Sequence, residues 1–460
     1  MTIVLLALLA AVATLEAEIL READVVDSVR RNHPVLLGAL AGRDIADAQY
    51  LEAQGKFDTT IRSSFNADTF GYYENRRADA SLEQPLAFQG MSVYGGYRVG
   101  EGTFAPYDGK LDTRSYGEWR SGLKLPLMRN REIDSRRAGL EQARLGRTIA
   151  GLSADQQRLV LLQAAIARYW YWVAAGRRLA VTRAVLDIAR MRQQLLEEGV
   201  REGQLPAIDA IDNRRAILQR QASLIEAERG FQQAAIDLSL YLRDANGRTR
   251  LAVFDEVPPA FPAATDLPGN ALDTGIDEAI ARRPELARLR TLIDQTEVDL
   301  SLARNAAKPA VDLVAGFTAE NGTGTVRRGP REFKAGLAFE FPFQNRAARG
   351  KQGASEAKIR QLTRQQDYLR DQVQAEVRDA LSAVEAARAR VDVLENEVRV
   401  SRELEDAERT RFELGEGTLF ILNLREQATL DASIRRALAQ AEFQRAHAGY
   451  EYATGRLLGR

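Results

Sequence analysis

The pattern of hydrophobic and polar positions keeps a helical period over two very long stretches, residues 131–201 and 346–414. No proline interrupts either stretch. In the second stretch, small and β-branched residues recur every seven positions, which is the spacing of a coiled-coil seam. These residues are Val377, Val384, Val391 and Val398, together with Ala380, Ala387 and Leu394. The pattern predicts two helices that are each on the order of 100 Å long.

Shorter helices are predicted on both sides of each long one. They cover residues 24–53 and 207–243 in the first half of the chain, and 277–306 and 418–454 in the second half. Placed end to end, the two short helices of the first half are about as long as residues 131–201. The sequence therefore predicts a rod in which two short helices lie alongside one long antiparallel partner.

Between the first short helix and the long helix of each half, the period changes from 3.6 to 2, as expected where strands follow a helix. The alternating segments are 57–70, 79–100 and 115–127 in the first half, and 311–317 and 337–343 in the second. Such strands suit a barrel that faces lipid outside and water inside. Alternation alone fits a soluble sheet with one wet face equally well. Short strands that cannot close a barrel within one chain would leave exposed edges, which favours closure by several copies.

The two halves of the chain repeat one plan. Asn32-His33-Pro34 lies over Arg282-Arg283-Pro284 at an offset of 250, and Gly203 lies over Gly417 at an offset of 214. The fall in offset leaves 36 additional residues in the first half. We assign them to an added hairpin in the strand region, which gives the first half four strands.

The predicted organisation has four parts. The apolar run at the N-terminus ends in Ala11-Val12-Ala13, which predicts a signal peptide over residues 1–13, although no basic residue precedes the run. An ordinary apolar helix start is the alternative. Repeat 1 is expected over 14–243 and repeat 2 over 275–460. The segment 244–274 is rich in proline and glycine and reads as a connector outside the helical barrel.

Composition excludes several classes of function. Lys+Arg and Asp+Glu are both 64, so no net charge points to a nucleic-acid partner. The chain has no cysteine and two histidines, and no triad, phosphate loop or metal-ligand cluster stands out, so we expect no cofactor, no metal and no enzyme. A mean hydropathy of −0.32 without a long apolar run argues against an α-helical membrane protein.

From about residue 20 onward, the chain resembles the TolC-like outer membrane efflux protein family, the outer membrane factors. The resemblance rests on three pairs of motifs in the same order in each half. They are NHPVL and RRPEL, LPLMRNREIDSRRAGLEQA (125–143) and FPFQNRAARGKQGASEA (341–357), and EGQLPAIDAID (202–212) and GEGTLFILNLREQATL (415–430).

The resemblance implies a mainly α fold with a membrane β-barrel. Three copies would form a β-barrel in the outer membrane and a long antiparallel coiled-coil α-barrel across the periplasm. It implies a passive exit channel of a tripartite efflux or type I secretion system. Its partners would be a periplasmic adaptor (membrane fusion) protein, an inner-membrane RND, ABC or MFS-type transporter, and outer membrane lipid. The family minimum is two strands per repeat, so the added hairpin would either widen the barrel or lie on it. A soluble coiled-coil scaffold is the alternative.

The resemblance also implies a periplasmic aperture ringed by acidic residues. By position these are Asn423 and Glu426, with Asp209 and Asp212 in the first half. A ring of three Glu426 carboxylates would attract cations, and Asn423 lacks the charge usual there. The alternative is that these are solvated first-turn residues favoured by the helix dipole.

The turns at the predicted helix tips are candidates for docking the adaptor. Gly203 and Gly417 would let the backbone reverse direction at low cost. Leu205, Leu419 and Phe420 beside them would be exposed on an isolated tip, and a docked adaptor hairpin would explain such apolar groups.

Overall fold

The structure is a computed structural model that describes residues 19–108, 111–324 and 331–459. The predicted signal peptide over 1–13 lies outside the described residues. The chain divides into two compact units, which we treat separately. The helical unit lies within Met1–Gly38, Asp155–Arg283 and Arg370–Arg460, and the sheet unit within Ala39–Ala154 and Pro284–Leu369.

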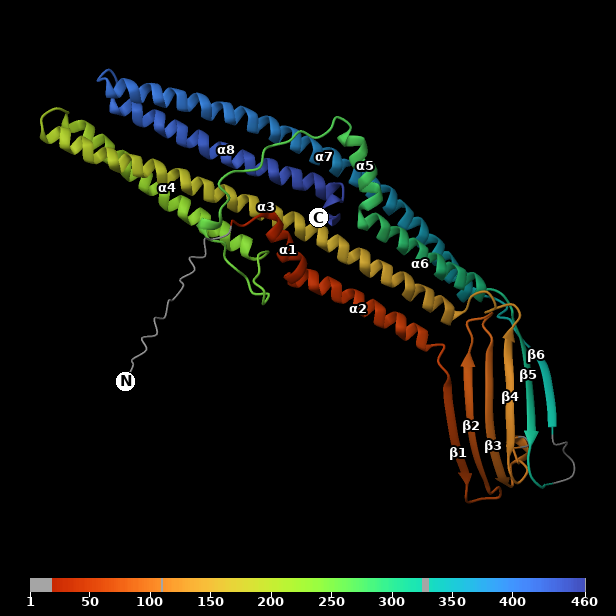
Figure 1. The fold of residues 1–460 in the computed structure, drawn as a ribbon. Helices are drawn as coiled ribbons and strands as arrows, with labels where there is room; N and C mark the ends of the chain where they lie inside the picture. Colours follow the sequence, from red (N-terminus) through yellow and green to blue (C-terminus); the bar gives the residue numbers. More distant parts are fainter. Residues whose placement is uncertain (1–18, 109–110, 325–330, 460) are drawn as a thin grey trace, which may run out of the picture. The chain divides into compact units, whose positions relative to one another are not determined.

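The predicted helices are present, but each first helix is broken in two. The helices are α1 (Glu22–Asn32), α2 (Pro34–Gly55), α3 (Ser135–Arg201), α4 (Ala207–Ser239), α5 (Ala271–Arg282), α6 (Pro284–Ala306), α7 (Arg346–Glu413) and α8 (Leu419–Ala453) (Figure 1). His33 and Arg283 have extended ψ angles of 121° and 116°. Each precedes a proline, whose ring disfavours the helical conformation of the residue before it. Pro34 and Pro284 therefore mark helix starts.

Short 3-10 turns complete the helical elements at η1 (Pro106–Asp108), η2 (Phe254–Glu256) and η3 (Arg456–Gly459). Between α4 and α5, η2 is the one helical element of the described connector. Over the described ranges, none of the helices combines the length and apolar character needed to cross a bilayer.

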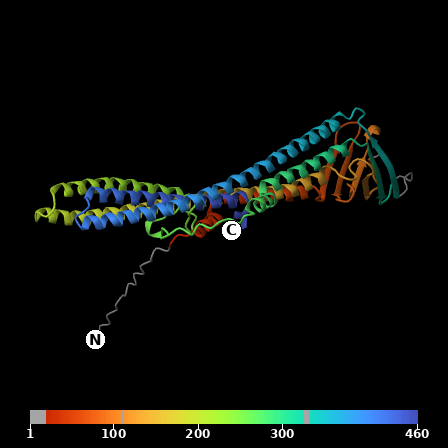
Figure 2. The same ribbon diagram turned by 90° about the horizontal axis from the view of Figure 1, so that it is seen from above.

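In the helical unit, α4 lies beside α3 and α8 lies beside α7 (Figure 2). The predicted heptad seam of α7 is confirmed, because Val377, Val384, Val391 and Val398 expose no more than 2% of their surface. The seam therefore packs α7 against its neighbours along several turns.

An aromatic cluster in α3 packs between helices. The buried members are Tyr169, Trp170 and Trp172. The Tyr169 hydroxyl donates to the Leu20 carbonyl at 2.9 Å, and Trp170 Nε1 donates to the Glu22 carboxylate at 2.7 Å. These bonds satisfy the polar atoms of the two rings and tie the start of α1 to the middle of α3.

The described part of the sheet unit forms one antiparallel sheet of six strands in chain order (Figure 1). The strands are β1 (Thr60–Asp68), β2 (Asn75–Pro85), β3 (Ser92–Gly102), β4 (Glu118–Pro126), β5 (Ala310–Glu320) and β6 (Arg331–Glu340). Four come from the first half and two from the second, so the predicted added hairpin is confirmed and comprises β2 and β3. Gln89 and Gly90 turn this hairpin with φ angles of 50° and 68°.

The two faces of the sheet differ in chemistry on every strand. Residues directly opposite each other in neighbouring strands share a face. One such row runs Ile61, Leu82, Gly95, Ser121, Phe317 and Phe333. The adjacent row, on the other face, runs Arg62, Ser81, Gly96, Arg120, Thr318 and Glu332. The apolar face carries large exposed side chains, namely Ile61, Phe65, Leu82, Trp119, Phe317, Phe333, Leu337 and Phe339.

Both edges of the sheet are bare in the single chain. Among the described residues, β1 pairs with β2 alone and β6 pairs with β5 alone. All residues of β1 and of β6 are exposed. Each edge therefore presents a row of backbone donors and acceptors that a neighbouring strand would satisfy.

The α7 seam predicts a site-specific loss of stability. Truncating Val384 to alanine removes two buried methyl groups and is expected to lower the free energy of unfolding by about 2 kcal/mol. Val393→Ala is the matched control, because Val393 lies on the same helix and is 67% exposed. Its effect is expected to stay within about 0.5 kcal/mol. Guanidinium unfolding followed by helical circular dichroism measures both, and an unchanged Val384→Ala midpoint would contradict the packed seam.

Candidate channel aperture and tip

The two helix tips are built by turns of the same geometry. Gly203 follows α3 and Gly415 follows α7, with left-handed φ angles of 73° and 79°. The Gly203 amide donates to the Val200 carbonyl at 3.1 Å, and the Gly415 amide donates to the Phe412 carbonyl at 3.0 Å. A glycine is favoured at both positions because side chains make this conformation costly.

These turns correct the predicted register between the halves. Gly203 corresponds to Gly415, an offset of 212, so the predicted offset of 214 is wrong by two residues. Gly417 is small for a different reason, since a Cβ there would lie 2.9 Å from the Phe412 amide nitrogen. At the corrected offset, Asn423 and Glu426 correspond to Ile211 and Arg214 rather than to two aspartates.

The apolar residues of the tip divide into a buried group and an exposed group. The prediction that Leu419 is exposed is wrong, because it is 1% exposed and packs with Leu196 and Ala210. Leu205 lies partly buried against the same group. Phe420 is 59% exposed, as predicted. The sequence interpretation missed further exposed apolar side chains near the tip, namely Ile208, Ile211, Leu414 and Leu424.

Glu426 lies at the centre of a cluster of ion pairs that joins three helices. Its carboxylate is 4% exposed and accepts hydrogen bonds from Arg192 on α3 and Arg220 on α4. Arg220 Nη2 lies 2.8 Å from Glu426 Oε2, and Arg192 Nη1 lies 3.1 Å from the same oxygen. The second terminal nitrogen of Arg192 also donates to Glu426 Oε1. We call Arg192, Arg220 and Glu426 the tip cluster.

Asn423 and Asp212 extend the tip cluster. Arg192 Nη1 donates to Asn423 Oδ1 at 3.1 Å, and Asn423 Nδ2 donates to Asp212 Oδ2 at 3.4 Å. Asp212 also pairs with Arg215 at 2.9 Å. The structure therefore brings Asn423, Glu426 and Asp212 together. Asp209 lies half-buried in the first turn of α4, where the helix dipole favours a carboxylate.

The charges of the tip cluster keep Glu426 ionised. Burial by itself would raise the pKa of the Glu426 carboxyl, but the hydrogen bonds and charges of Arg192 and Arg220 outweigh it and lower the pKa. With two guanidinium groups around one carboxylate, the tip cluster carries an excess of one positive charge. The negative charge of Glu426 is thus neutralised by ion pairs that connect α8 to α3 and α4.

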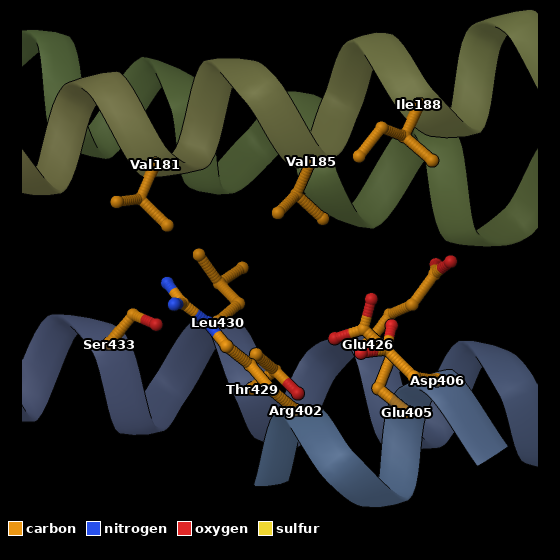
Figure 3. Close-up of a pocket in the computed structure, with 10 residues that line it drawn as sticks. All are labelled: Val181, Val185, Ile188, Arg402, Glu405, Asp406, Glu426, Thr429, Leu430 and Ser433. Carbon is orange, nitrogen blue, oxygen red and sulfur yellow. The ribbon is translucent and has the colours of Figure 1, made fainter. Parts of the chain in front are cut away.

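A cavity of 260 Å³ lies beside the tip cluster. Figure 3 shows Val181, Val185 and Ile188 of α3 facing Glu426 and Leu430 of α8 across this space. On its α7 side the cavity is lined by Arg402, Glu405 and Asp406. The helices thus border a partly open pocket next to the buried ion pairs.

Sequence reasoning missed both arginines of the tip cluster. Arg192 stands in an apolar helical stripe between Ile188 and Leu196. Arg220 stands in a similar stripe between Ala216 and Ala227, which are both buried. A basic residue within a core-facing stripe needs a buried acidic partner, so this signal was present in the sequence.

Comparison with known proteins agrees with this geometry. Residues 275–456 match the model of a family described as outer membrane efflux protein. The predicted resemblance is confirmed on these residues, and the family description agrees with the predicted location in the outer membrane. No curated protein matches the chain.

Solved outer membrane channels share the fold. The Vibrio cholerae protein VceC aligns with a TM-score of 0.64 at 14% identity, over 94% of this chain and 96% of that one. The open state of Neisseria gonorrhoeae MtrE aligns with a TM-score of 0.64 at 15% identity, over 95% and 89%. Campylobacter jejuni CmeC aligns with a TM-score of 0.62 at 15% identity, over 94% and 85%.

Removing the charge of Glu426 is expected to loosen the tip. Glu426→Gln leaves Arg192 and Arg220 buried without their carboxylate, at a cost of about 3 kcal/mol. Asp212→Asn is the matched control, since it removes a partly exposed charge worth about 0–1 kcal/mol. Limited trypsin digestion at the exposed Arg201 and Arg411 measures the opening of the tip. Equal cleavage rates in the two variants would contradict the tip cluster as a structural link.

Proposed function

We propose that this chain, which shares the fold of outer membrane channels and matches their family over residues 275–456, is the outer membrane channel of a tripartite efflux or type I secretion system. Three copies form the conduit, with their strands in one barrel. The channel is passive and has no catalytic step. A periplasmic adaptor and an inner-membrane transporter of the RND, ABC or MFS type deliver its cargo.

The observation that carries this proposal is the two-faced sheet with bare edges. Its exposed apolar face suits lipid, and its polar face suits water. A sheet of six strands with unpaired β1 and β6 satisfies its backbone in a membrane only by closing with other copies. A soluble coiled-coil scaffold is disfavoured, because it would leave Phe333, Leu337 and Phe339 in water.

The tips supply the surface for the adaptor. Exposed apolar side chains gather at the start of α4 and α8, with Ile208 and Ile211 on α4 and Phe420 on α8. An adaptor hairpin that covers these groups removes them from water. Leu419 contributes indirectly, because its buried contacts with Leu196 and Ala210 hold the two tips together.

The tip cluster acts as the gate. Arg192 and Arg220 belong to α3 and α4, whereas Glu426 belongs to α8, so the cluster ties the two helical hairpins together. Breaking these ion pairs frees one hairpin from the other, and the aperture opens by a change in helix packing. Exposed Glu426 carboxylates would then line the opening and attract cations.

The membrane assignment predicts that an arginine is harmful at one residue of β6 and tolerated at the next. Leu337 lies on the apolar face of β6, and the next residue, Ala338, lies on the polar face. Leu337→Arg is expected to cost about 2–4 kcal/mol in a bilayer, whereas Ala338→Arg faces water and is tolerated. The yield of folded trimer in outer membrane fractions measures the difference. A soluble, fully folded Leu337→Arg protein would contradict the membrane assignment.

The gate is expected to open in acid. Since the pKa of Glu426 is lowered in the folded protein, its ion pairs stabilise the closed tip above pH 4.5 and are lost as the pH falls through the lowered value. Conductance in planar bilayers is therefore expected to rise when the tip side is brought below pH 4.5. Glu426→Gln is expected to conduct at pH 7 and to respond little to acid.

Recordings at pH 7, where the Glu426 carboxylates keep their charge, test their role in ion selectivity. In channels that conduct at this pH, Glu426→Gln is expected to shift the reversal potential in a salt gradient towards anions relative to the unsubstituted chain. Asp209→Asn is the comparison variant, because Asp209 is the candidate aperture residue in the first turn of α4. An unchanged reversal potential in Glu426→Gln would count against a role of Glu426 in the aperture. The change in conductance of this variant on acidification would still test its role in the gate.

A further inference from the structure

The hairpin of β2 and β3 is an insertion in the first half of the chain. Among the described residues, the segment between α2 and α3 forms four strands and the segment between α6 and α7 forms two. The offset between the halves falls from 250 at Pro34 to 212 at Gly203, which leaves 38 extra residues between these landmarks. An antiparallel pair added between β1 and β4 keeps those two strands antiparallel, as they would be if they were direct neighbours.

The inserted hairpin is part of the wall of the sheet and does not lie on top of it. Its first strand pairs with β1 from Glu83 to Asn75, and its second pairs with β4 from Ser92 to Arg98. Between the two, β2 and β3 pair over their full length. Over Ala78–Leu82 and Val93–Val99 the hairpin continues the same apolar and polar faces that the other four strands carry, whereas Arg76 and Glu101 share the apolar face at one end of the hairpin.

Charged residues of the hairpin fix which face meets water. Arg77 and Asp79 on β2 and Arg98 on β3 form a network with Glu118 and Arg120 on β4. Arg98 Nη2 lies 2.7 Å from Glu118 Oε1, and Arg120 also pairs with Asp79. Charged side chains that face lipid are strongly destabilising, so this network belongs on the inner side of the barrel.

We propose that the inserted hairpin makes the barrel one of eighteen strands, six from each of three copies, with a wide water-filled interior. The inference rests on the proposed trimeric channel. For strands about 4.8 Å apart and tilted by about 40°, the barrel radius is about 18 Å with eighteen strands and about 12 Å with twelve. Barrels of this larger size leave an aqueous channel.

Distances between copies test the strand number. The chain has no cysteine, so single cysteines can be introduced for spin labels. We choose β5, which lies in the wall with or without the hairpin, and use Val314→Cys on the polar face and Ala315→Cys on the apolar face. Averaging the two positions cancels the direction of the labels. Double electron–electron resonance on the purified trimer is expected to give a mean near 31 Å, the side of a triangle in a circle of about 18 Å.

A mean near 21 Å would overturn the inference, because it corresponds to twelve strands. In that case the trimer stands and only the place of the hairpin is wrong. Absence of any distance between copies would instead defeat the proposed trimeric channel itself. A larger distance for Val314→Cys than for Ala315→Cys would also overturn the inference, because the polar face would then lie outside.

An excision variant provides the matched control. Replacing residues 65–117 by Asn-Gly joins Ser64 to Glu118, which already share one row of the sheet through Asp79 and Arg98. The mean distance on β5 is expected to fall to about 21 Å. An excised trimer that keeps the distance of the full chain would overturn the inference, and if excision prevents assembly, the full-length distances decide alone.

Discussion

The unpaired backbone of the two edge strands is the constraint on which the rest of the structure depends. β1 and β6 are exposed along their whole length, and one face of the sheet between them is apolar. In lipid, each unsatisfied backbone group costs several kcal/mol. The sheet is therefore stable in a membrane only as part of a closed wall. The proposed oligomer, location and channel function all rest on that single requirement.

The ion pairs at the tip govern a different property, namely how firmly the helices are held together there. A buried ion pair adds little to stability compared with apolar packing, but it becomes costly to break when only one partner is removed or neutralised. Glu426 between Arg192 and Arg220 has this property, whereas the surrounding contacts of Leu419 are apolar. A link of this kind holds firmly in one state and is released by a change of charge or by a competing partner.

Periodicity predicted the elements well because helices and strands are local patterns. The α7 seam and the extra hairpin were both readable from residue spacing. The register between the halves was wrong by two residues, because Gly417 resembles Gly203 in sequence while Gly415 has its conformation. The exposure of Leu419 and the partners of Glu426 were missed for a common reason. They depend on contacts between α8 and the first half, such as Arg220 with Glu426, more than 200 residues apart.

Backbone hydrogen exchange of the two edge strands tests the central claim most directly. In the purified assembly, the amides of β1 and β6 are expected to be protected to the same degree as those of β3, which is paired on both sides within the chain. Protection of both edges, lost together when the assembly is dissociated, is the result that the account predicts. Rapid exchange along β1 and β6 in the intact particle would contradict it, since the edges would then be open and no barrel would be closed.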